Sequence, residues 1–284
     1  MYKKIIAVCL LMLLLLPVLP TQALDTYGGY PIPVDLEING SFIRCVQKPV
    51  LINNSAYIPL RAFADAIGAT IWWDDAEKAA TVTKDGHTMV FFLNKDYSLL
   101  DGSYGPGIAI HYGLMFVPAR TVCDLLGYSI EWDDFYYVVD IEAPGVTVPD
   151  SCKDYSYTYE DMLYLGKITH VECGAEPFTT RIGIANTVIN RVRSFYYPNT
   201  IKGAIYDTKN GVQYPPAHTS YMNRTPSVSS MLAAKCALNG VELVGDSVAF
   251  VNVKYLASSW AHNNMQHYVT LGIVAFYRFP YPIY

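Results

Sequence analysis

The chain has 284 residues, a formal net charge of −5 at pH 7, 52% hydrophobic residues and 16% charged residues. This length is enough for two ordinary domains, and the hydrophobic content is typical of a packed protein rather than a disordered one. An acidic chain offers no basic surface to phosphates, so the composition argues against a nucleic-acid partner.

Residues 1–23 are predicted to be a signal peptide. Lys3 and Lys4 precede an apolar run from Ile5 to Leu19, and Ala23 supplies a small residue for cleavage. The run is shorter than the roughly 20 residues that a membrane span needs, which favours cleavage over a permanent anchor. We therefore expect a secreted protein that meets the membrane only through this segment.

Residues 32–143 are predicted to form one strand-rich domain that contains two repeated units. Four pairs of residues match at a single offset of 59 residues: Pro59 with Pro118, Arg61 with Arg120, Gly68 with Gly127 and Trp73 with Trp132. So many matches at one offset indicate an internal repeat. Each unit reads as strand, helix, strand, turn and strand, with the proline opening the helix and the glycine following its end. The two arginines are expected to make structural hydrogen bonds rather than to bind a ligand.

This repeat resembles the copper amine oxidase N-terminal-like domain. The resemblance rests on Pro59-Leu60-Arg61 and Gly68 in the first unit and on their counterparts in the second. It implies no copper chemistry here, because this half of the chain has only His87 and His111. We expect the domain to attach the protein to the cell envelope or to present the domain that follows.

Residues 144–156 are predicted to be a linker, and residues 157–284 a second domain. The linker is rich in proline and glycine and shows no sustained period. Beyond it, a capping signal at Thr158 begins a helix that runs toward Cys173, and further helices are expected over about 179–193 and 227–239. Residues 247–253 read as a strand, and 268–277 as a buried apolar segment. The expected fold class is α+β for the whole chain.

Glu172 is the candidate catalytic residue. It lies near the end of an otherwise apolar helix, where partial desolvation raises the pKa of a carboxyl and keeps it protonated near neutral pH. A protonated carboxyl is what cleavage of a glycosidic bond requires, since the leaving oxygen must receive a proton. From residue types alone, a solvated or capping role for this glutamate is the stronger interpretation.

The second domain resembles the cell-wall hydrolases of the spore cortex-lytic (SleB/CwlJ) type. The segments that carry the resemblance are 172–177 (Glu-x-x-x-Glu-Pro), 184–192 (which includes Asn190-Arg191-Val192), 197–201, 213–214, 250–252 and Trp260. The resemblance implies a lysozyme-like α+β domain that cuts the muramic acid–glucosamine backbone of peptidoglycan, with Glu172 as general acid. It also implies a lytic transglycosylase variant, in which one carboxyl acts first as acid and then as base. No metal or organic cofactor is expected.

Further site residues follow from the same segments. Glu176 is a possible second carboxylate four residues after Glu172, although a capping or bracing role before Pro177 is slightly favoured. The predicted substrate-binding residues are Gln213, Tyr214, Asn252 and Trp260. Other tyrosines that could stack on sugar rings are Tyr197, Tyr221, Tyr255 and Tyr268.

Three alternatives remain open at this stage. The chain could be a non-enzymatic envelope-binding protein with a degenerate hydrolase domain. It could be an amidase or peptidase in which Cys173 and His170 or His267 form a dyad. A zinc site around His170 and Glu172 is the weakest reading, because no His-Glu-x-x-His motif is present. The expected partner is peptidoglycan, in the cell wall or the spore envelope.

Overall fold

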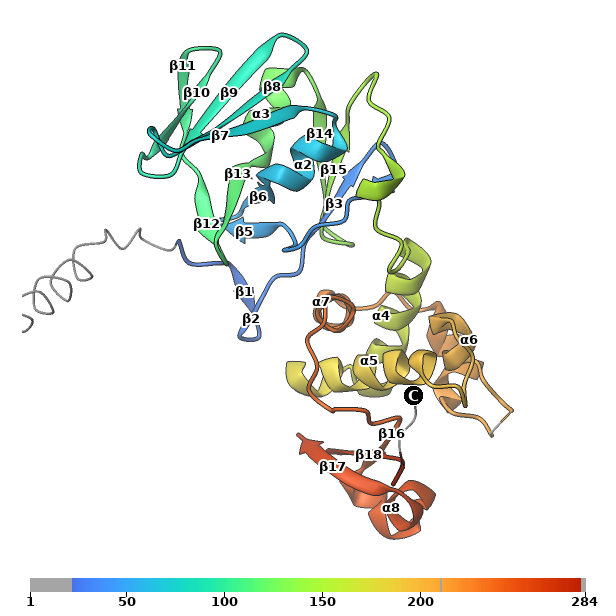
Figure 1. The fold of residues 1–284 in the computed structure, drawn as a ribbon. Helices are drawn as coiled ribbons and strands as arrows, with labels where there is room; N and C mark the ends of the chain where they lie inside the picture. Colours follow the sequence, from blue (N-terminus) through green and yellow to red (C-terminus); the bar gives the residue numbers. More distant parts are fainter. Residues whose placement is uncertain (1–21, 210, 282–284) are drawn as a thin grey trace, which may run out of the picture.

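The computed structural model describes residues 22–209 and 211–281 and shows two lobes (Figure 1). Nearly all of the predicted signal peptide, residues 1–21, lies outside the described residues. Over those described ranges, no helix combines the length and the apolar character that crossing a bilayer requires. We call the part from β1 to β15 the N-terminal lobe and the part from α4 to β18 the C-terminal lobe.

Short strands and two short helices make up the N-terminal lobe. The strands are β1 (Thr26–Tyr27), β2 (Tyr30–Pro31), β3 (Asp35–Ile38), β4 (Ser41–Phe42), β5 (Val50–Ile52), β6 (Ser55–Pro59), β7 (Thr70–Asp74), β8 (Ala79–Lys84), β9 (His87–Phe92), β10 (Tyr97–Leu100), β11 (Ser103–Pro106), β12 (Ala109–His111), β13 (Leu114–Pro118), β14 (Ser129–Asp133) and β15 (Val138–Glu142). The helices are α2 (Leu60–Ala66) and α3 (Ala119–Leu126). The strands form a hairpin, β1-β2, and three larger sheets with the orders β11-β10-β9-β8-β7, β12-β13-β6-β5 and β14-β15-β3-β4.

The predicted repeat is present as two units, β6-α2-β7-β8 and β13-α3-β14-β15. Gly68 and Gly127 follow the two helices in the left-handed conformation, with φ of +67° and +69°, which a residue with a side chain rarely adopts. The prolines were expected in the first helical turn, but Pro59 and Pro118 lie one position earlier. Each has extended ψ, ends the preceding strand and occupies the N-cap position.

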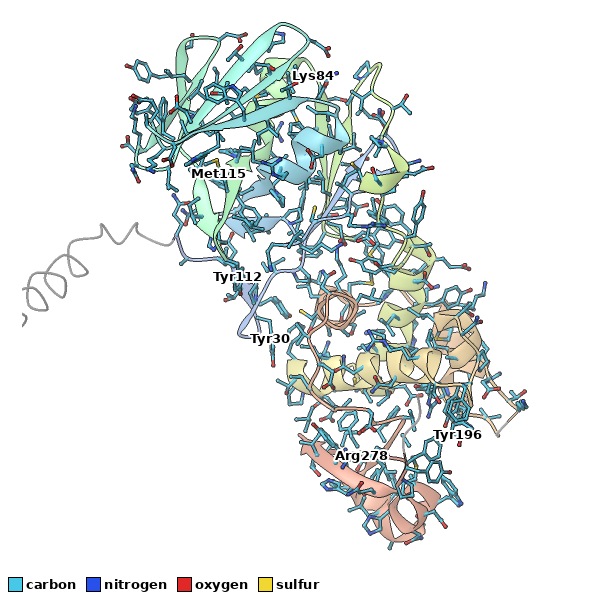
Figure 2. All side chains as sticks on the ribbon, viewed as in Figure 1. Tyr30, Lys84, Tyr112, Met115, Tyr196 and Arg278 are labelled. Atoms are coloured by element: carbon cyan, nitrogen blue, oxygen red, sulfur yellow. The ribbon has the colours of Figure 1, made fainter. Side chains whose placement is uncertain are left out.

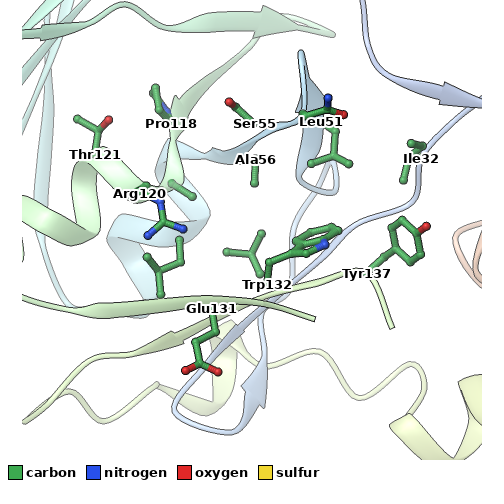
Figure 3. Close-up of a pocket in the computed structure, with 14 residues that line it drawn as sticks. Ile32, Leu51, Ser55, Ala56, Pro118, Arg120, Thr121, Glu131, Trp132 and Tyr137 are labelled. Carbon is green, nitrogen blue, oxygen red and sulfur yellow. The ribbon is translucent and has the colours of Figure 1, made fainter. Parts of the chain in front are cut away.

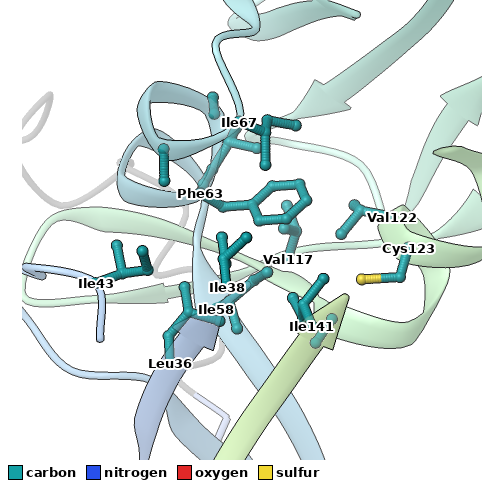
Figure 4. Packing of buried hydrophobic residues seen from close by; sticks show 14 of the residues in the cluster. Leu36, Ile38, Ile43, Ile58, Phe63, Ile67, Val117, Val122, Cys123 and Ile141 are labelled. Atoms are coloured by element: carbon teal, nitrogen blue, oxygen red, sulfur yellow. The ribbon is translucent and has the colours of Figure 1, made fainter. Parts of the chain in front are cut away.

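The core of the N-terminal lobe lies between the sheets and the two helices (Figure 4). Phe63 of α2 and Val122 of α3 are equivalent residues of the two units, and both are fully buried in this one cluster. Ile58 and Val117, from the paired strands β6 and β13, lie beside them. The two units therefore share a single core, which neither could complete alone.

The C-terminal lobe consists of helices packed against a small sheet. Its helices are α4 (Tyr159–Cys173), α5 (Phe178–Arg193), α6 (Ile201–Ile205), α7 (Val228–Leu238) and α8 (Trp260–Asn264), with 3₁₀ turns at η2 (Pro215–His218), η3 (Ser220–Asn223) and η4 (Val253–Ser258). A further 3₁₀ turn, η1 (Asp150–Cys152), lies in the segment between the two lobes. The strands β16 (Ala249–Asn252), β17 (Gln266–Leu271) and β18 (Val274–Arg278) form one antiparallel sheet in the order β16-β18-β17. This arrangement confirms the predicted α+β fold class.

Most elements of this lobe match the sequence-based expectations. Thr158 and Asp161 form a capping box at the start of α4. Helices α5 and α7 and strand β16 lie within the predicted ranges. The segment 268–277 was expected to be buried throughout, and this is wrong for its first half. Residues of β17 are largely exposed, whereas β18 is buried because it is the central strand of the sheet.

A buried polar cluster joins the two lobes. Lys235 of α7 is completely buried, forms a 2.8 Å ion pair with Asp35 of β3, and donates to the main-chain carbonyl of Tyr137 at 2.9 Å. The Tyr157 hydroxyl donates to Asp35 at 2.7 Å, and Lys48 lies 3.0 Å from the same carboxylate. The ion pair of Lys235 with Asp35 and its hydrogen bond to Tyr137 cross the junction, so the two lobes are attached to one another by buried polar contacts.

Two further contacts support this junction. The ring of Phe178, at the start of α5, packs against Tyr27 and Tyr30 of the β1-β2 hairpin, with ring centroids 5.1 and 5.9 Å apart (Figure 2). The segment 144–156, predicted as a linker, is also held in place: the amide of Arg44 donates to Cys152 and the amide of Asp154 donates to Phe42.

Candidate active site

Glu172 lines a cavity of about 630 Å³ in the C-terminal lobe. It lies four residues after Ile168 and three after Thr169, both fully buried, so the helical period turns its side chain inward from the last turn of α4. Its Oε1 atom is buried and has no hydrogen-bond partner in the part of the chain that is described. At least this oxygen of the carboxyl is withdrawn from water without a hydrogen bond to replace it.

This burial raises the pKa of Glu172 to about 7, against a moderate opposing effect of Arg191. A carboxyl with such a pKa is substantially protonated near neutral pH. The expectation that helix burial keeps this side chain protonated thus has a physical basis in the structure. Among the described residues that line the cavity, Glu172 is the only carboxylic acid.

Arg191 of α5 is the second charged residue of the cavity, and the sequence analysis assigned it no role. Its Nε donates to the carbonyl of Val248 at 2.7 Å, while its Nη1 is buried and unpartnered in the described structure. The guanidinium lies over the ring of Tyr214, 4.5 Å from its centroid, and 5.2 Å from that of Tyr197. Arg191 belongs to the Asn190-Arg191-Val192 segment, which carries part of the family resemblance. That membership was the sequence signal that could have identified it as a site residue.

Asparagines on the same helix fix the wall opposite Glu172. Asn190 donates to the carbonyls of Gly245 and Ser247 at 2.7 and 2.9 Å. Asn186 donates to the carbonyl of Val241 and accepts from the amide of Leu243. These bonds hold the loop that leads into β16, whose residues 249–251 line the cavity. Polar residues buried in α5 thus serve to position a cavity wall rather than to contact a ligand.

Aromatic side chains form much of the remaining lining. Trp260, at the start of α8, lines the cavity and is 66% exposed, as its predicted role in stacking requires. Tyr197 also lines the cavity, together with three aromatic residues that the sequence analysis did not select: Tyr196, Phe279 and Tyr281. The ring centroids of Phe279 and Tyr281 lie 5.4 Å apart in a stacked arrangement, and Tyr196, which is labelled in Figure 2, packs against Phe279. These residues come from distant parts of the chain.

The predicted substrate-binding residues fall into two groups. Gln213 lines the cavity alongside Trp260. Tyr214 and Asn252 lie outside the lining, and their direct contact with substrate stays a prediction. Tyr214 is completely buried beneath Arg191, and the Asn252 side chain accepts a hydrogen bond from the amide of Lys254 at the start of η4. Tyr221, Tyr255 and Tyr268 likewise lie outside the lining.

Glu176 is not brought to the cavity. Helix α4 ends at Cys173, so Glu176 does not continue the helical face of Glu172. A Cβ atom added to Gly272, in the β17-β18 turn, would lie 3.2 Å from the Glu176 carboxylate. The side chain therefore faces that turn, and its backbone carbonyl accepts from Arg181 at 2.9 Å. The side chain thus lies beside the β17-β18 turn, and its predicted role in bracing the turn before Pro177 stays a prediction.

The proposed thiol nucleophile is poorly suited to catalysis. Cys173 is buried in an apolar cluster with Ile184 and Phe276, and its thiol donates to the carbonyl of Thr169. Burial raises the pKa of the thiol to about 12, which disfavours the reactive thiolate. Within the described ranges, no three His, Cys, Asp or Glu side chains gather as a metal-binding group.

Comparisons with known proteins match a different family to each half of the chain. The family described as Cell Wall Hydrolase matches residues 175–277, and the Copper amine oxidase N-terminal domain matches residues 37–106. The resemblances predicted from the sequence are thus confirmed for both halves. The first match begins just after Glu172, and the second covers mainly the first repeated unit.

Curated relatives and solved structures of the same kind were also found. The spore cortex-lytic enzymes of Bacillus cereus and Oceanobacillus iheyensis are each 24% identical to this chain, over 116 and 121 residues. These matches cover 41% of this chain and 42% and 40% of the two relatives, so the chain spans less than half of their length. The catalytic domains of SleB from Bacillus cereus and Bacillus anthracis are each 22% identical, with a TM-score of 0.40, and cover 44% of this chain and 94% and 99% of those chains.

Proposed function

We propose that this protein is an enzyme that cleaves the muramic acid–glucosamine backbone of peptidoglycan, with Glu172 as the general acid. The observation that carries the proposal is a largely buried carboxyl in an aromatic-lined cavity, with a pKa of about 7 and one oxygen that has no hydrogen-bond partner among the described residues. The relatives named spore cortex-lytic enzymes support a glycan of the cell wall or spore cortex as the substrate.

The bond-breaking step follows from the protonation state of Glu172. The carboxyl gives its proton to the oxygen that bridges two sugars, the bond from that oxygen to C1 of the muramic sugar breaks, and positive charge develops at C1. As the carboxylate forms, the nearby guanidinium of Arg191 offsets its charge. Trp260 and Gln213 are placed to contact the sugar rings beside the broken bond.

A lytic transglycosylase reaction fits the cavity better than hydrolysis with two carboxylates. Both common forms of glycoside hydrolysis use a second Asp or Glu, as base or as nucleophile. Only Glu172 provides a carboxyl among the described lining residues. In the alternative reaction, the C6 hydroxyl of the muramic sugar attacks C1 and returns its proton to Glu172. The product is a 1,6-anhydro ring, and no water is consumed.

Export and envelope attachment complete the proposal. The basic and apolar start of the chain would direct secretion, and the N-terminal lobe would hold the enzyme at the cell wall or spore envelope. The buried Asp35–Lys235 pair supports this division of labour, because it fixes the cavity of one lobe relative to the surface of the other.

Mass spectrometry of digested peptidoglycan tests this function. We expect the purified protein to release fragments that end in 1,6-anhydro-muramic acid, which are lighter by one water than hydrolysis products. Glu172→Gln should lower the rate by roughly 10²–10⁴-fold, the usual contribution of a general acid. Glu176→Gln is the matched control, since that carboxyl lies outside the cavity, and its rate should stay within about twofold of the wild type.

Several results would contradict the proposal. Reducing sugar ends would replace transglycosylation by hydrolysis. New peptide ends would point to an amidase or peptidase and to Cys173. A Glu172→Gln variant as active as the wild type, or a wild-type protein that leaves peptidoglycan intact, would remove the assignment of Glu172 as general acid.

A further inference from the structure

The internal repeat builds two equivalent grooves on the N-terminal lobe. The Trp132 groove has a volume of about 530 Å³ and is lined by α3 and β14 of the second unit together with residues 54–56 of the first (Figure 3). The Trp73 groove, of about 420 Å³, is lined by α2 and β7 of the first unit together with residues 113–115 of the second. Most lining positions of one groove, moved by 59 residues, are lining positions of the other.

Strand pairing explains this equivalence. Strands β6 and β13 are antiparallel, and Ile58 pairs with Val117, its own equivalent in the repeat. On either side, Tyr57 pairs with Pro118 and Pro59 pairs with Phe116. Such pairing places a local twofold axis between the units, so each unit contributes a strand and its preceding turn to the groove of the other. Neither groove would exist in a single unit.

Each groove holds an exposed tryptophan and an exposed arginine. Trp73 and Trp132 are 46% and 39% exposed, although tryptophan is usually well buried. In the described part of the chain, neither Arg61 nor Arg120 forms a hydrogen bond or an ion pair with a side chain. In Figure 3, Arg120 and Trp132 lie on the same side of β14, and the carboxylate of Glu131, which also lines the groove, points to the other side. The structural hydrogen bonds expected for these arginines are therefore not made.

We propose that the two grooves are binding sites for the glycan strands of peptidoglycan. The flat face of each tryptophan suits the apolar face of a pyranose ring. The guanidinium beside it suits a carboxylate of the lactyl group or the stem peptide, which it can bind with two parallel hydrogen bonds. Peptidoglycan carries sugars and carboxylates together and repeats them along a strand, which matches a pair of equivalent grooves. The inference rests on the cell wall as the target of the proposed enzyme.

Two grooves on one rigid lobe would act together. Once one groove holds a strand, the other groove is exposed to the same wall at a high effective concentration. Two sites of modest affinity therefore give tight attachment. Because the junction between the lobes is fixed by Lys235 and Asp35, a wall held by the N-terminal lobe would lie at a constant position relative to the Glu172 cavity. The grooves would thus raise the local concentration of substrate without taking part in the chemistry.

Sedimentation with insoluble peptidoglycan tests the proposal. The full protein carries Glu172→Gln so that the sacculi stay intact, and the sacculi are first stripped of attached secondary polymers. We expect Trp73→Ala and Trp132→Ala each to weaken binding by about tenfold, because a single remaining site gains no avidity. The double variant should reduce binding by more than about 100-fold, because neither site then remains. Trp72→Ala is the matched control: Trp72 is 51% exposed on the same strand but lies outside the groove, and its loss should leave binding unchanged.

Other arms of the experiment separate the possible outcomes. Arg61→Ala with Arg120→Ala repeats the test with exposed residues, in case the tryptophan variants unfold. Chitin, an uncharged sugar polymer, should bind at least about tenfold more weakly than peptidoglycan, because the arginines then have no carboxylate. The inference is overturned if the double tryptophan variant binds like its parent, if Trp72→Ala weakens binding equally, if stripping the sacculi abolishes binding, or if chitin binds as tightly. The sedimentation experiment uses protein in which cleavage is disabled. A negative result for binding therefore does not affect the mass-spectrometry test of cleavage, and a negative result for cleavage does not affect the binding test.

Discussion

Two buried carboxyls, in two regions of the molecule, have opposite electrostatic surroundings. Asp35, at the junction of the lobes, lies within 3.0 Å of Lys235 and Lys48. Burial opposes its charge, but these two lysines hold the pKa of Asp35 below its usual value. Glu172 is also withdrawn from water, yet it has no ion pair among the described residues, and burial raises its pKa to about 7.

The difference shows what each region is suited to do. A buried carboxylate with cationic partners is charged and fixed, which serves attachment. A buried carboxyl without a partner gains and loses its proton near neutral pH, which serves acid–base chemistry at the cost of stability. Arg191 explains why Glu172 is not held fully neutral, because the guanidinium favours the charged form without pairing with it.

The largest effect is expected at the junction. Asp35→Asn leaves Lys235 buried without its counter-charge and should lower the free energy of unfolding by about 3–5 kcal/mol, measured by urea denaturation at pH 7. Combining Asp35→Asn with Lys235→Met removes both buried charges, and we expect this double variant to be more stable than Asp35→Asn alone.

The matched control for this change is the surface pair of Lys202 and Glu160, whose nitrogen and oxygen lie 2.8 Å apart. Glu160→Gln should cost no more than about 1 kcal/mol, as exposed ion pairs do. If Asp35→Asn lowered the free energy of unfolding by as little as Glu160→Gln does, the buried cluster would not be what holds the lobes together.

A smaller effect of opposite sign is expected at the cavity. Between the ordinary glutamate pKa of 4.5 and the folded value of about 7, the native state binds more protons than the unfolded state, so Glu172 lowers stability as pH rises through this window. Glu172→Gln cannot ionise, and should be more stable than the wild type by roughly 1–3 kcal/mol at pH 8 and close to it at pH 4.5. Unfolding titrations at both pH values measure the difference. If Glu172→Gln were more stable than the wild type by the same amount at both pH values, the pKa of about 7 for Glu172 would be contradicted.

Local signals in the sequence predicted much of the fold. The capping box at Thr158 and the periodic faces of α4 and α5 depend on neighbouring residues, and the structure has them where expected. The repeat was recognised because its residues match at one fixed offset, and the structure contains both units. The exposure of β17 was missed because it depends on strand order: β18 is central and β17 is at the edge. An apolar run alone does not distinguish the two.

The site was less predictable because it is assembled from distant segments. The inward direction of Glu172 follows from the period of α4, so a local pattern was enough. Tyr214 and Asn252 belong to family segments but lie outside the cavity lining, and membership of such a segment does not separate a ligand contact from a supporting role. Arg191, Phe279 and Tyr281 were missed because only the folded chain places α5 and the C-terminal residues at one cavity. The equivalence of the two grooves was likewise hidden until the pairing of Ile58 with Val117 was known.

The smallest expected effect tests how Arg191 acts on Glu172. In the wild type, activity on peptidoglycan should fall as pH rises through about 7, because the acid loses its proton. Arg191→Gln removes a positive charge that favours the ionised form, so the pKa of Glu172 should rise and the alkaline limb of the pH profile should move up by about 0.5–1 unit. Arg191→Lys keeps the charge and should leave the limb near its wild-type position, whatever either variant does to the maximal rate. A limb that stays in place in Arg191→Gln, or moves to lower pH, would mean that the guanidinium does not tune the acid, and its burial over Tyr214 would then serve packing alone.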